Sequence, residues 1–388
     1  MNELDRVARL AQELREREID RLLVNEPVNL RYLTGFTGSN GLALIAASPE
    51  RRQLFFTDFR YATQSAEQVP EGFARWPIDD PAVCPEWGID RRSVAPADLL
   101  AAVEPVLVDE LELAGPHRQR RLGFDDSSLT VSQHTRLSEL LPRGWDLRPC
   151  AGIVEELREV KDTQEVARIR AAAQLADEAL TEVLEAGVVG RTERDVAIEL
   201  ELRMRKLGAR APSFPSIVAC GEHGALPHAE PRDVQIPRGV LLTIDWGATL
   251  DGYCSDCTRT YATGPLAEEA VEAYELVLRA QKAALDTVRA GMGGREVDGA
   301  ARAIIDEAGR AENFGHGVGH GVGMEIHEAP RLSRTAPDRP LRAGNVVTVE
   351  PGVYLPGRLG VRIEDLVLVT DTGHERLTRL PKELTTVE

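Results

Sequence analysis

The sequence predicts an α+β fold, in which a smaller α/β domain precedes a C-terminal antiparallel sheet covered by helices. Length is the first indication, because 388 residues leave room for two or three domains with substantial cores. Composition is the second, because 43% hydrophobic and 28% charged residues are typical of a soluble globular protein. The third is the order of patterns: strands and helices recur in pairs along the second half, which favours helices packed over a sheet.

The N-terminal elements follow from hydrophobic periodicity and turn residues. Residues 4–18 predict a helix whose buried face contains Leu4, Val7, Leu10, Ala11 and Leu14. Apolar runs separated by Pro and Gly predict strands at residues 21–25, 42–46 and 53–57. The segment 32–40 is too rich in Gly and Thr for a helix and is predicted to be a loop. Further short helices are expected at residues 98–100 and 132–141.

An irregular composition at residues 122–149 marks the predicted domain junction, because Gly, Pro and Asp interrupt the apolar pattern there. We therefore divide the chain into an N-terminal domain at residues 1–130, a linker at residues 131–155 and a C-terminal domain at residues 156–388.

The C-terminal domain begins with a long helical pattern at residues 154–184. Thr192 and Asp195 resemble a capping box that opens the next helix, and Gly208 would end it. Two more helices are predicted at residues 265–290 and 295–308. The predicted strands are residues 240–250, 253–263, 346–355 and 361–369.

Charge and hydropathy exclude several classes of partner. The formal net charge is −17, from 46 basic and 63 acidic residues, which argues against binding to nucleic acid or an anionic membrane. No apolar run approaches the roughly 18 residues of a membrane helix. Residues 1–18 also lack the apolar centre of a signal peptide. We expect a cytoplasmic protein that binds neither nucleic acid nor membranes.

The five cysteines are scattered along the chain, at Cys84, Cys150, Cys220, Cys254 and Cys257. Their odd number and irregular spacing do not predict a disulfide framework. Cys254 and Cys257 form a lone C-x-x-C, which we interpret as two small strand residues beside Asp256 rather than as a zinc or redox site.

Two aspartates lie in apolar strand patterns. Asp245 ends the apolar run at 242–245, and Asp256 follows eleven positions later in a second strand pattern. Between them, Asp251 and Gly252 give a strong hairpin signal, so adjacent antiparallel strands should bring the two carboxylates together. Two carboxylates inside a sheet are unfavourable unless they are protonated or neutralised by cations.

Acidic residues in apolar strand patterns recur near the C-terminus. Glu350 ends an apolar strand pattern, and Glu364 stands in the middle of another. Arg362 and Glu364 should share a face, because side chains alternate along a strand with period two. A single such acid is readily explained by a solvated face or a buried ion pair, but four acids in comparable contexts are not.

Three histidines and several glycines share the segment 314–328: His316, His320 and His327. Glycine lets the backbone approach closely, and neutral histidine is both a nitrogen ligand and a proton shuttle. Three histidines in a glycine-rich segment are hard to explain by packing alone.

One histidine and four carboxylates make a candidate ligand set of Asp245, Asp256, His320, Glu350 and Glu364. Carboxylate-rich sites favour hard or borderline divalent ions. The set suits two ions about 3.5 Å apart with bridging carboxylates, which would activate a water and polarise a carbonyl for hydrolysis. Manganese is our first expectation, with cobalt, iron or zinc as alternatives.

These motifs together resemble those of the pitta-bread metallopeptidases, a family that includes aminopeptidase P, prolidase, methionine aminopeptidase and creatinase. The resemblance rests on Asp245 in I-D-W-G-A, Asp256 in Y-C-S-D-C-T-R-T, His320 in H-G-V-G-H-G-V-G, Glu350 in T-V-E-P-G and Glu364 in R-I-E-D. It implies that Asp245 chelates one ion and that Asp256 and Glu364 bridge both. It also implies that His320 and Glu350 hold the second ion.

The resemblance implies roles for further residues. Glu350 matches the general base for the attacking water. His228, His316 and His327 match histidines that contact the substrate, and Arg362 matches an arginine beside the bridging glutamate. Asp58 and Arg60 have two alternative roles, either stabilising the N-terminal domain or reaching a neighbouring subunit, and His223 receives no definite role.

Segments 32–40 and 56–60 resemble the creatinase-type N-terminal domain, which leaves the proline-specific branch of the family. The expected function is that of an Xaa-Pro aminopeptidase, whose substrate is a peptide with proline in second position. An Xaa-Pro dipeptidase is the alternative. A catalytically silent binding module and a creatinase-like hydrolase of a non-peptide bond are disfavoured by the complete ligand set. The resemblance also implies a homodimer or homotetramer.

Overall fold

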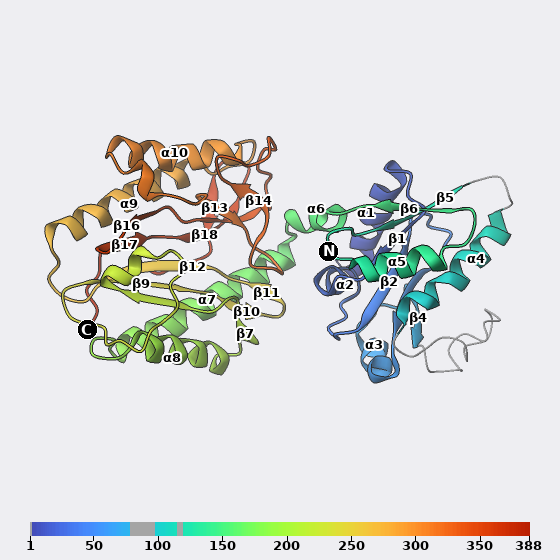
Figure 1. Cartoon of the computed structure of the whole chain (residues 1–388), viewed down its shortest axis with the longest axis horizontal. Helices are drawn as coiled ribbons and strands as arrows, with labels where there is room; N and C mark the ends of the chain where they lie inside the picture. The colour runs from blue at the N-terminus through green and yellow to red at the C-terminus, as the bar shows by residue number, and fades with distance from the viewer. Residues whose placement is uncertain (1, 78–97, 115–118) are drawn as a thin grey trace. The chain divides into compact units, whose positions relative to one another are not determined.

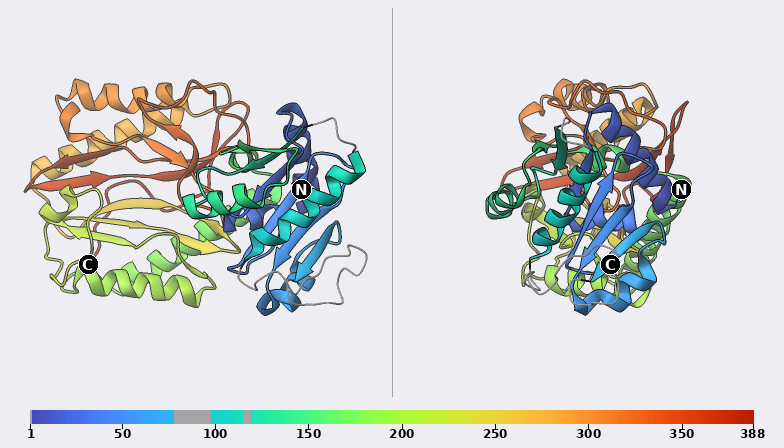
Figure 2. Two further views of the ribbon diagram at one scale, coloured as in Figure 1. Left: turned by 45° about the vertical axis from the view of Figure 1, so that its right-hand side comes forward. Right: turned by 90° about the vertical axis from the view of Figure 1, so that its right-hand side faces the viewer.

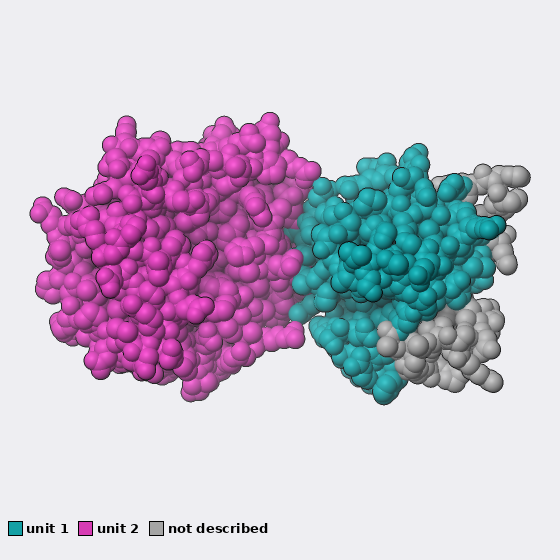
Figure 3. All heavy atoms as spheres, in the orientation of Figure 1, with its two compact units in different colours: residues 1–158 teal, residues 159–388 magenta. Residues whose placement is uncertain are grey.

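The computed structural model describes residues 2–77, 98–114 and 119–388, and the chain divides into two units at residues 1–158 and 159–388 (Figure 3). The first unit is α/β, and the second is a set of antiparallel sheets covered by helices. The predicted α+β fold class is therefore confirmed. Cys84 lies outside the described residues.

A six-stranded sheet in the order β4-β3-β2-β1-β5-β6 forms the centre of the first unit (Figure 1). β1 pairs antiparallel with β2 and parallel with β5, so the sheet is mixed. The strands are β1 (Arg21–Val24), β2 (Gly41–Ala46), β3 (Gln53–Thr57), β4 (Phe73–Pro77), β5 (Arg120–Phe124) and β6 (Trp145–Pro149). The helices are α1 (Glu3–Glu16), α2 (Pro27–Thr34), α3 (Ala62–Gln68), α4 (Val103–Ala114) and α5 (Val131–Leu140), with 3₁₀ turns at Phe59–Tyr61 and Leu99–Ala102.

Two N-terminal details differ from prediction. Leu4 is 42% exposed, although the rest of the predicted helical face is buried. The predicted loop 32–40 begins only at Gly35, because α2 continues to Thr34. Glu26 caps this helix by accepting from the amides of Val28 and Asn29, and the positive φ of Gly35 (72°) ends it.

The predicted linker 131–155 is wrong, because these residues contain α5 and β6. β6 pairs in parallel with β5, and Trp145 is buried in the core of the first unit. The irregular composition arises from tight turns between elements, including one at Gly144, whose φ is +105°. The division between the units lies at residues 158/159.

The predicted helix at 154–184 is two helices, α6 (Ile153–Glu159) and α7 (Thr163–Glu185). Asp162 separates them, because its side chain accepts from the amides of Gln164 and Glu165 and so begins α7. The later helices are α8 (Glu193–Lys206), α9 (Glu268–Thr287) and α10 (Gly294–Glu307). Within the described ranges, no helix is both long and apolar enough to cross a membrane.

Every strand pair of the second unit is antiparallel, in the sheets β11-β10-β7, β12-β9-β8, β14-β13-β15-β18-β19 and β16-β17. Figures 1 and 2 show the strands between two helix pairs. α9 and α10 share a core with β15, β17 and β18, whereas α7 and α8 share one with β8 and β9. The strands are β7 (Ala211–Pro212), β8 (Ile217–Cys220), β9 (Leu241–Trp246), β10 (Ala248–Leu250), β11 (Tyr253–Cys254), β12 (Cys257–Ala262), β13 (Gly319–Gly321), β14 (Glu328–Leu332), β15 (Val346–Val349), β16 (Gly352–Leu355), β17 (Leu359–Arg362), β18 (Asp365–Val369) and β19 (His374–Arg376).

Each of the four long strands predicted in this unit is divided in two. The breaks fall at Gly247, at Ser255 and Asp256, at Glu350 and Pro351, and at Ile363 and Glu364. After a break the chain continues in another sheet, as when β15 is followed by β16. Three of the four predicted acidic ligands therefore lie where a strand leaves one sheet for the next.

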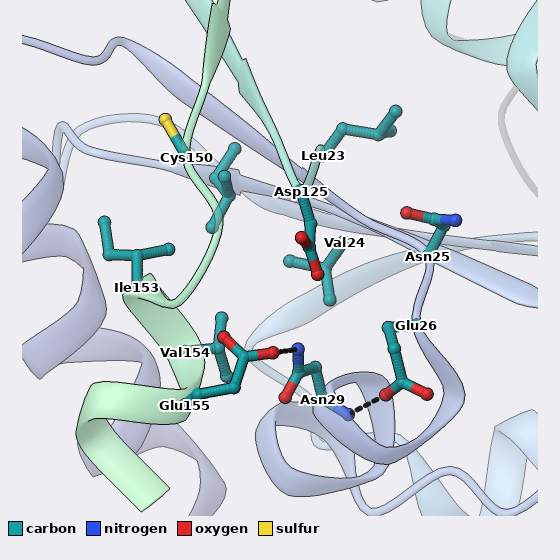
Figure 4. A pocket seen from close by; sticks show the side chains of 11 residues that line it. Leu23, Val24, Asn25, Glu26, Asn29, Asp125, Cys150, Ile153, Val154 and Glu155 are labelled. Atoms are coloured by element: carbon teal, nitrogen blue, oxygen red, sulfur yellow. Dashed lines mark hydrogen bonds between the residues drawn. The ribbon is translucent and has the colours of Figure 1, made fainter. Parts of the chain in front are cut away.

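A small pocket lies in the first unit at the carboxyl ends of β1 and β5 (Figure 4). Its polar lining residues include Asn25, Glu26, Asn29, Asp125 and Glu155. Asn29 connects two of the others: its amide donates to Glu26, and its side chain donates to Glu155 (2.5 Å). None of the predicted site residues lines this pocket.

Candidate metal centre

Strand pairing explains how the predicted acids converge. Asp245 on β9 faces Thr258 of β12 in the register, and Asp256 comes just before β12. The predicted Asp251–Gly252 hairpin is confirmed, since both residues have positive φ (50° and 85°) between β10 and β11. Glu364 joins them because its amide donates to the carbonyl of Thr258 (3.1 Å).

The acids and one histidine form a single buried cluster. One carboxylate oxygen from each of Asp245, Asp256 and Glu364 lies within 4.8 Å of the others. His320, on β13, directs Nε2 towards Asp256 Oδ2 (3.6 Å) and Glu350 Oε1 (3.4 Å). The structure thus brings all five residues of the predicted ligand set together.

Burial of so many acids perturbs their protonation. Burial, together with repulsion from the neighbouring carboxylates, raises the pKa of Asp256 and Glu364 well above their ordinary values. Burial also raises the pKa of Glu350, although His316 and Arg362 oppose the shift. Without a cation, the cluster can relieve its repulsion only by retaining protons.

Several atoms of the cluster lack the partners that buried polar groups normally have. Among the described residues, nothing donates a hydrogen bond to Asp245 Oδ1 or Glu364 Oε1, although both are buried. His320 Nδ1–H donates to the Gly321 carbonyl (3.0 Å), which leaves the Nε2 lone pair facing carboxylate oxygens. Lone pairs and carboxylates directed at one space suit divalent cations, so the residues fit the expected metal group.

Arg362 is the principal positive charge beside the cluster and is 4% exposed. Its Nη2 donates to Asp245 Oδ2 (2.7 Å), and its Nη1 donates to the Tyr354 hydroxyl (3.0 Å). Burial would lower the pKa of this guanidinium, but the negative surroundings raise it instead. The Tyr354 hydroxyl lies 2.8 Å from His316 Nε2, so a hydrogen-bonded chain joins Arg362 to His316.

The three outer histidines lie near the cluster in different ways. His327 is exposed, and its ring centroid is 4.4 Å from that of His320. His228 is also exposed, and its charge contributes to lowering the pKa of both His316 and His327, for which burial is the main cause. The structure therefore places His316 and His327 beside the residues of the cluster, and His228 near both of them.

Close backbone packing explains the glycines around His320. A Cβ on Gly319 would lie 2.0 Å from the Thr348 carbonyl oxygen, and one on Gly321 would lie 2.1 Å from that of Ala329. Arg302, held by Asp298, also donates to the carbonyls of Phe314 and His316 and so anchors the start of this segment. Glycine is required where β13 passes between its neighbours.

Three residues that hydrogen-bond to predicted site residues were not identified from the sequence. Thr258 donates to Glu364 Oε2 (2.7 Å), and Thr348 donates to Glu350 Oε1 (3.2 Å). Tyr354 connects Arg362 with His316. Each stands two or four positions from a predicted ligand, on the same side of a strand pattern, and this period-two relation could have identified it.

The remaining candidates lie elsewhere. Cys254 ends β11 and Cys257 begins β12, which agrees with their interpretation as strand residues, and both are buried free thiols. In the first unit, Asp58 accepts from Arg60 and Asn40, which is a local structural contact.

Two family patterns match this chain. Residues 167–371 match metallopeptidase family M24, and residues 6–160 match the creatinase/prolidase N-terminal domain. The Xaa-Pro dipeptidase of Pyrococcus furiosus is 34% identical over 380 residues, covering 98% of this chain and 99% of the relative.

Two solved structures match this chain over all or nearly all of its length. A structure described as an Xaa-Pro dipeptidase from Bacillus anthracis superposes with a TM-score of 0.88 at 37% identity, covering 100% of both chains. The X-Pro aminopeptidase from Thermotoga maritima gives a TM-score of 0.82 at 33% identity, covering 96% of this chain and 99% of that one.

Proposed function

Because this chain belongs to metallopeptidase family M24 and carries a creatinase/prolidase N-terminal domain, we propose that it is an exopeptidase that hydrolyses the Xaa–Pro bond at the N-terminus of peptides. The observation that carries the proposal is the buried cluster of Asp245, Asp256 and Glu364, whose oxygens converge without enough protein donors. A bond that precedes proline lacks an N–H and needs a dedicated site.

Asp245, Asp256, His320, Glu350 and Glu364 would hold two divalent ions, with manganese expected first and cobalt, iron or zinc as alternatives. When bound, such ions polarise the scissile carbonyl and lower the pKa of a water to near neutrality. The raised pKa values of Asp256, Glu350 and Glu364 mean that these carboxyls must release protons when cations bind.

The side chains around the ions would carry the proton transfers. Glu350 accepts a proton from the attacking water and passes it to the proline nitrogen, and Thr348 fixes one of its oxygens. His327 donates an N–H to the carbonyl oxygen that becomes negative, and partial burial of its ring lowers its pKa and favours the neutral form. His228 and His316 contact the substrate, and Arg362 holds Asp245 and, through Tyr354, His316.

Substrate length separates two forms of this function. The sequence favoured an Xaa-Pro aminopeptidase, and the Thermotoga maritima structure bears that name. The Pyrococcus furiosus relative and the Bacillus anthracis structure are both named Xaa-Pro dipeptidase, which supports the alternative. We keep the aminopeptidase as the first candidate and the dipeptidase as the second. A homodimer or homotetramer and a cytoplasmic location stay predictions.

One assay tests these proposals together. Protein treated with EDTA and then supplied with manganese is incubated with Xaa-Pro, Xaa-Pro-Yaa and a matched Xaa-Ala-Yaa peptide. We expect no hydrolysis after EDTA, recovery with metal, and cleavage only before proline. Cleavage of Xaa-Pro alone would assign a dipeptidase. Metal binding without any hydrolysis would instead indicate a binding module.

A further inference from the structure

Glu193, the first residue of α8, is fully buried and accepts hydrogen bonds from three residues. Its carboxylate accepts from the amide of Cys220 (2.9 Å) and from Nδ1 of His223 (2.9 Å). It also accepts from the amide (3.0 Å) and from Nε (3.1 Å) of Arg232. A single side chain thereby joins both ends of the segment 220–232.

This segment carries His228, yet His228 does little to fix its own position. Its side chain is exposed and makes no hydrogen bond within the part of the chain that the structure describes. Its ring is nevertheless close enough to His316 and His327 to affect their pKa. The position of His228 must therefore be set by the backbone of the segment.

The middle of the segment is held against the strands of the acidic centre. Gly224 lies so close to β17 that a Cβ on Gly360 would be 1.8 Å from its carbonyl oxygen. The carbonyl of Pro227, the residue before His228, accepts from Arg362 Nη1 (3.2 Å). Arg362 also binds Asp245, so the segment and the metal centre share one guanidinium.

We propose that Glu193 is a positioning residue: by holding Cys220, His223 and Arg232, it fixes the segment 220–232 and thereby presents His228 to the substrate. This inference rests on the proposed peptidase function and gives His223 a structural task. Glu193 itself is too deeply buried, and too fully occupied by donors, to contact a substrate.

Charge is central to this arrangement. Burial alone would raise the pKa of Glu193, but hydrogen bonds from Arg232 and Cys220 lower it to about 2. The carboxylate therefore stays ionised and can accept from all of its donors at once. Glutamine has the same shape, but whichever side its oxygen takes, its NH2 group would face donors: the Cys220 amide on one side, or His223 and Arg232 on the other.

A double-mutant cycle tests the effect on catalysis. E193Q should lower kcat/KM for Xaa-Pro peptides by about 10- to 100-fold, because small displacements of a catalytic contact have effects of this size. In an H228A background, the same change should cause less than about a 3-fold further loss, because both act through one imidazole. Additive losses would overturn the proposal. E199Q is the matched control, because Glu199 on the same helix binds Arg203 and Arg191 but not the segment.

Amide hydrogen exchange of the full-length protein gives a readout that needs no substrate. E193Q should speed exchange across residues 220–232 and leave the rest of the second unit unchanged, whereas E199Q should change neither. Unaltered exchange in that segment would refute the proposal even if the protein hydrolyses no peptide. If E193Q does not fold, R232Q removes the more exposed half of the contact and should show the same local effect.

Discussion

At the scale of single residues, the acidic cluster lowers the stability of the metal-free fold, because its arrangement suits cations. Glu364 is 1% exposed, with one oxygen bonded to Thr258 and the other unpartnered. Asp256 and Asp245 lie beside it. Buried like charges of this kind oppose folding unless protons or metal ions neutralise them.

E364Q should therefore separate stability from function. In the metal-free protein, the neutral amide should raise the free energy of unfolding by about 1–4 kcal/mol. Metal affinity should fall by more than about 100-fold, since changes at outer-shell positions alone lower it by about 10- to 100-fold. Urea denaturation in EDTA and calorimetric manganese titration measure the two effects. E312Q, which changes an exposed glutamate, is the control. If E364Q is less stable than the wild-type protein without metal, this account is wrong.

Replacement of Arg362 should destabilise the metal-free protein, whereas replacement of Glu364 should stabilise it. It donates to Asp245, Tyr354, Thr258 and the carbonyl of Pro227, and replacement by glutamine would leave Asp245 without its ion pair. We expect R362Q to lower the free energy of unfolding of the metal-free protein by about 3–5 kcal/mol. R362K keeps the charge but not the planar set of donors, so its loss should be smaller. Equal stability of R362Q and wild type in urea would exclude this role.

At the scale of elements, the acidic cluster depends on strands that end early. Asp256, Glu350 and Glu364 occupy the breaks between consecutive strands, where the backbone is released from one ladder and the side chains can turn towards a common space. β13 reaches the same place only because glycine lets it approach its neighbours.

Two glycines of the same segment provide a matched pair. A Cβ on Gly319 would collide with the Thr348 carbonyl at 2.0 Å, whereas nothing lies within 4 Å of one on Gly315. G319A should therefore destabilise the protein by about 1–3 kcal/mol or more and reduce peptidase activity, because His320 is the next residue. G315A should change stability by less than about 1 kcal/mol. Thermal denaturation and kcat/KM measure both; equal effects would mean that the close approach is unimportant.

At the scale of the whole molecule, metal binding and folding should be coupled through protons. In the metal-free fold the pKa values of Asp256, Glu350 and Glu364 are raised, so the folded state binds more protons than the unfolded chain. Their contribution is fully present below their unfolded pKa of about 4 and is lost as pH rises through the higher folded values.

Divalent ions should reverse this loss. At a free concentration of about 100 times Kd, manganese should add about 2.7 kcal/mol to the free energy of unfolding. Since binding releases protons, the gain in Tm should be larger near pH 8 than near pH 5.5, values that are about 1 unit above and 1.5 units below neutrality. Scanning calorimetry with and without manganese at each pH gives the gain in Tm. The other titrating groups cancel in this difference because they are the same in both samples. An equal gain at both pH values would show that these carboxyls are not the ligands.

Most helices and strands were predictable because they depend on local periodicity. The Asp251–Gly252 hairpin and β3 are examples in which turn chemistry and strand pattern agree. The linker at 131–155 was not predictable in this way, because only the pairing of β6 with β5 shows that it belongs to the first sheet. Likewise, the long apolar runs do not reveal where a strand changes sheets.

The sequence by itself determined which side chains are chemically out of place: acids in apolar strands and histidines among glycines. Only the tertiary structure decided that they meet, that Tyr354 connects Arg362 to His316, and that Glu193 supports the segment carrying His228. The physical reason is that local patterns report burial and backbone preference. The contacts of the site join strands separated by about a hundred residues, for example Asp245 and Arg362, and they depend on packing that no local window contains.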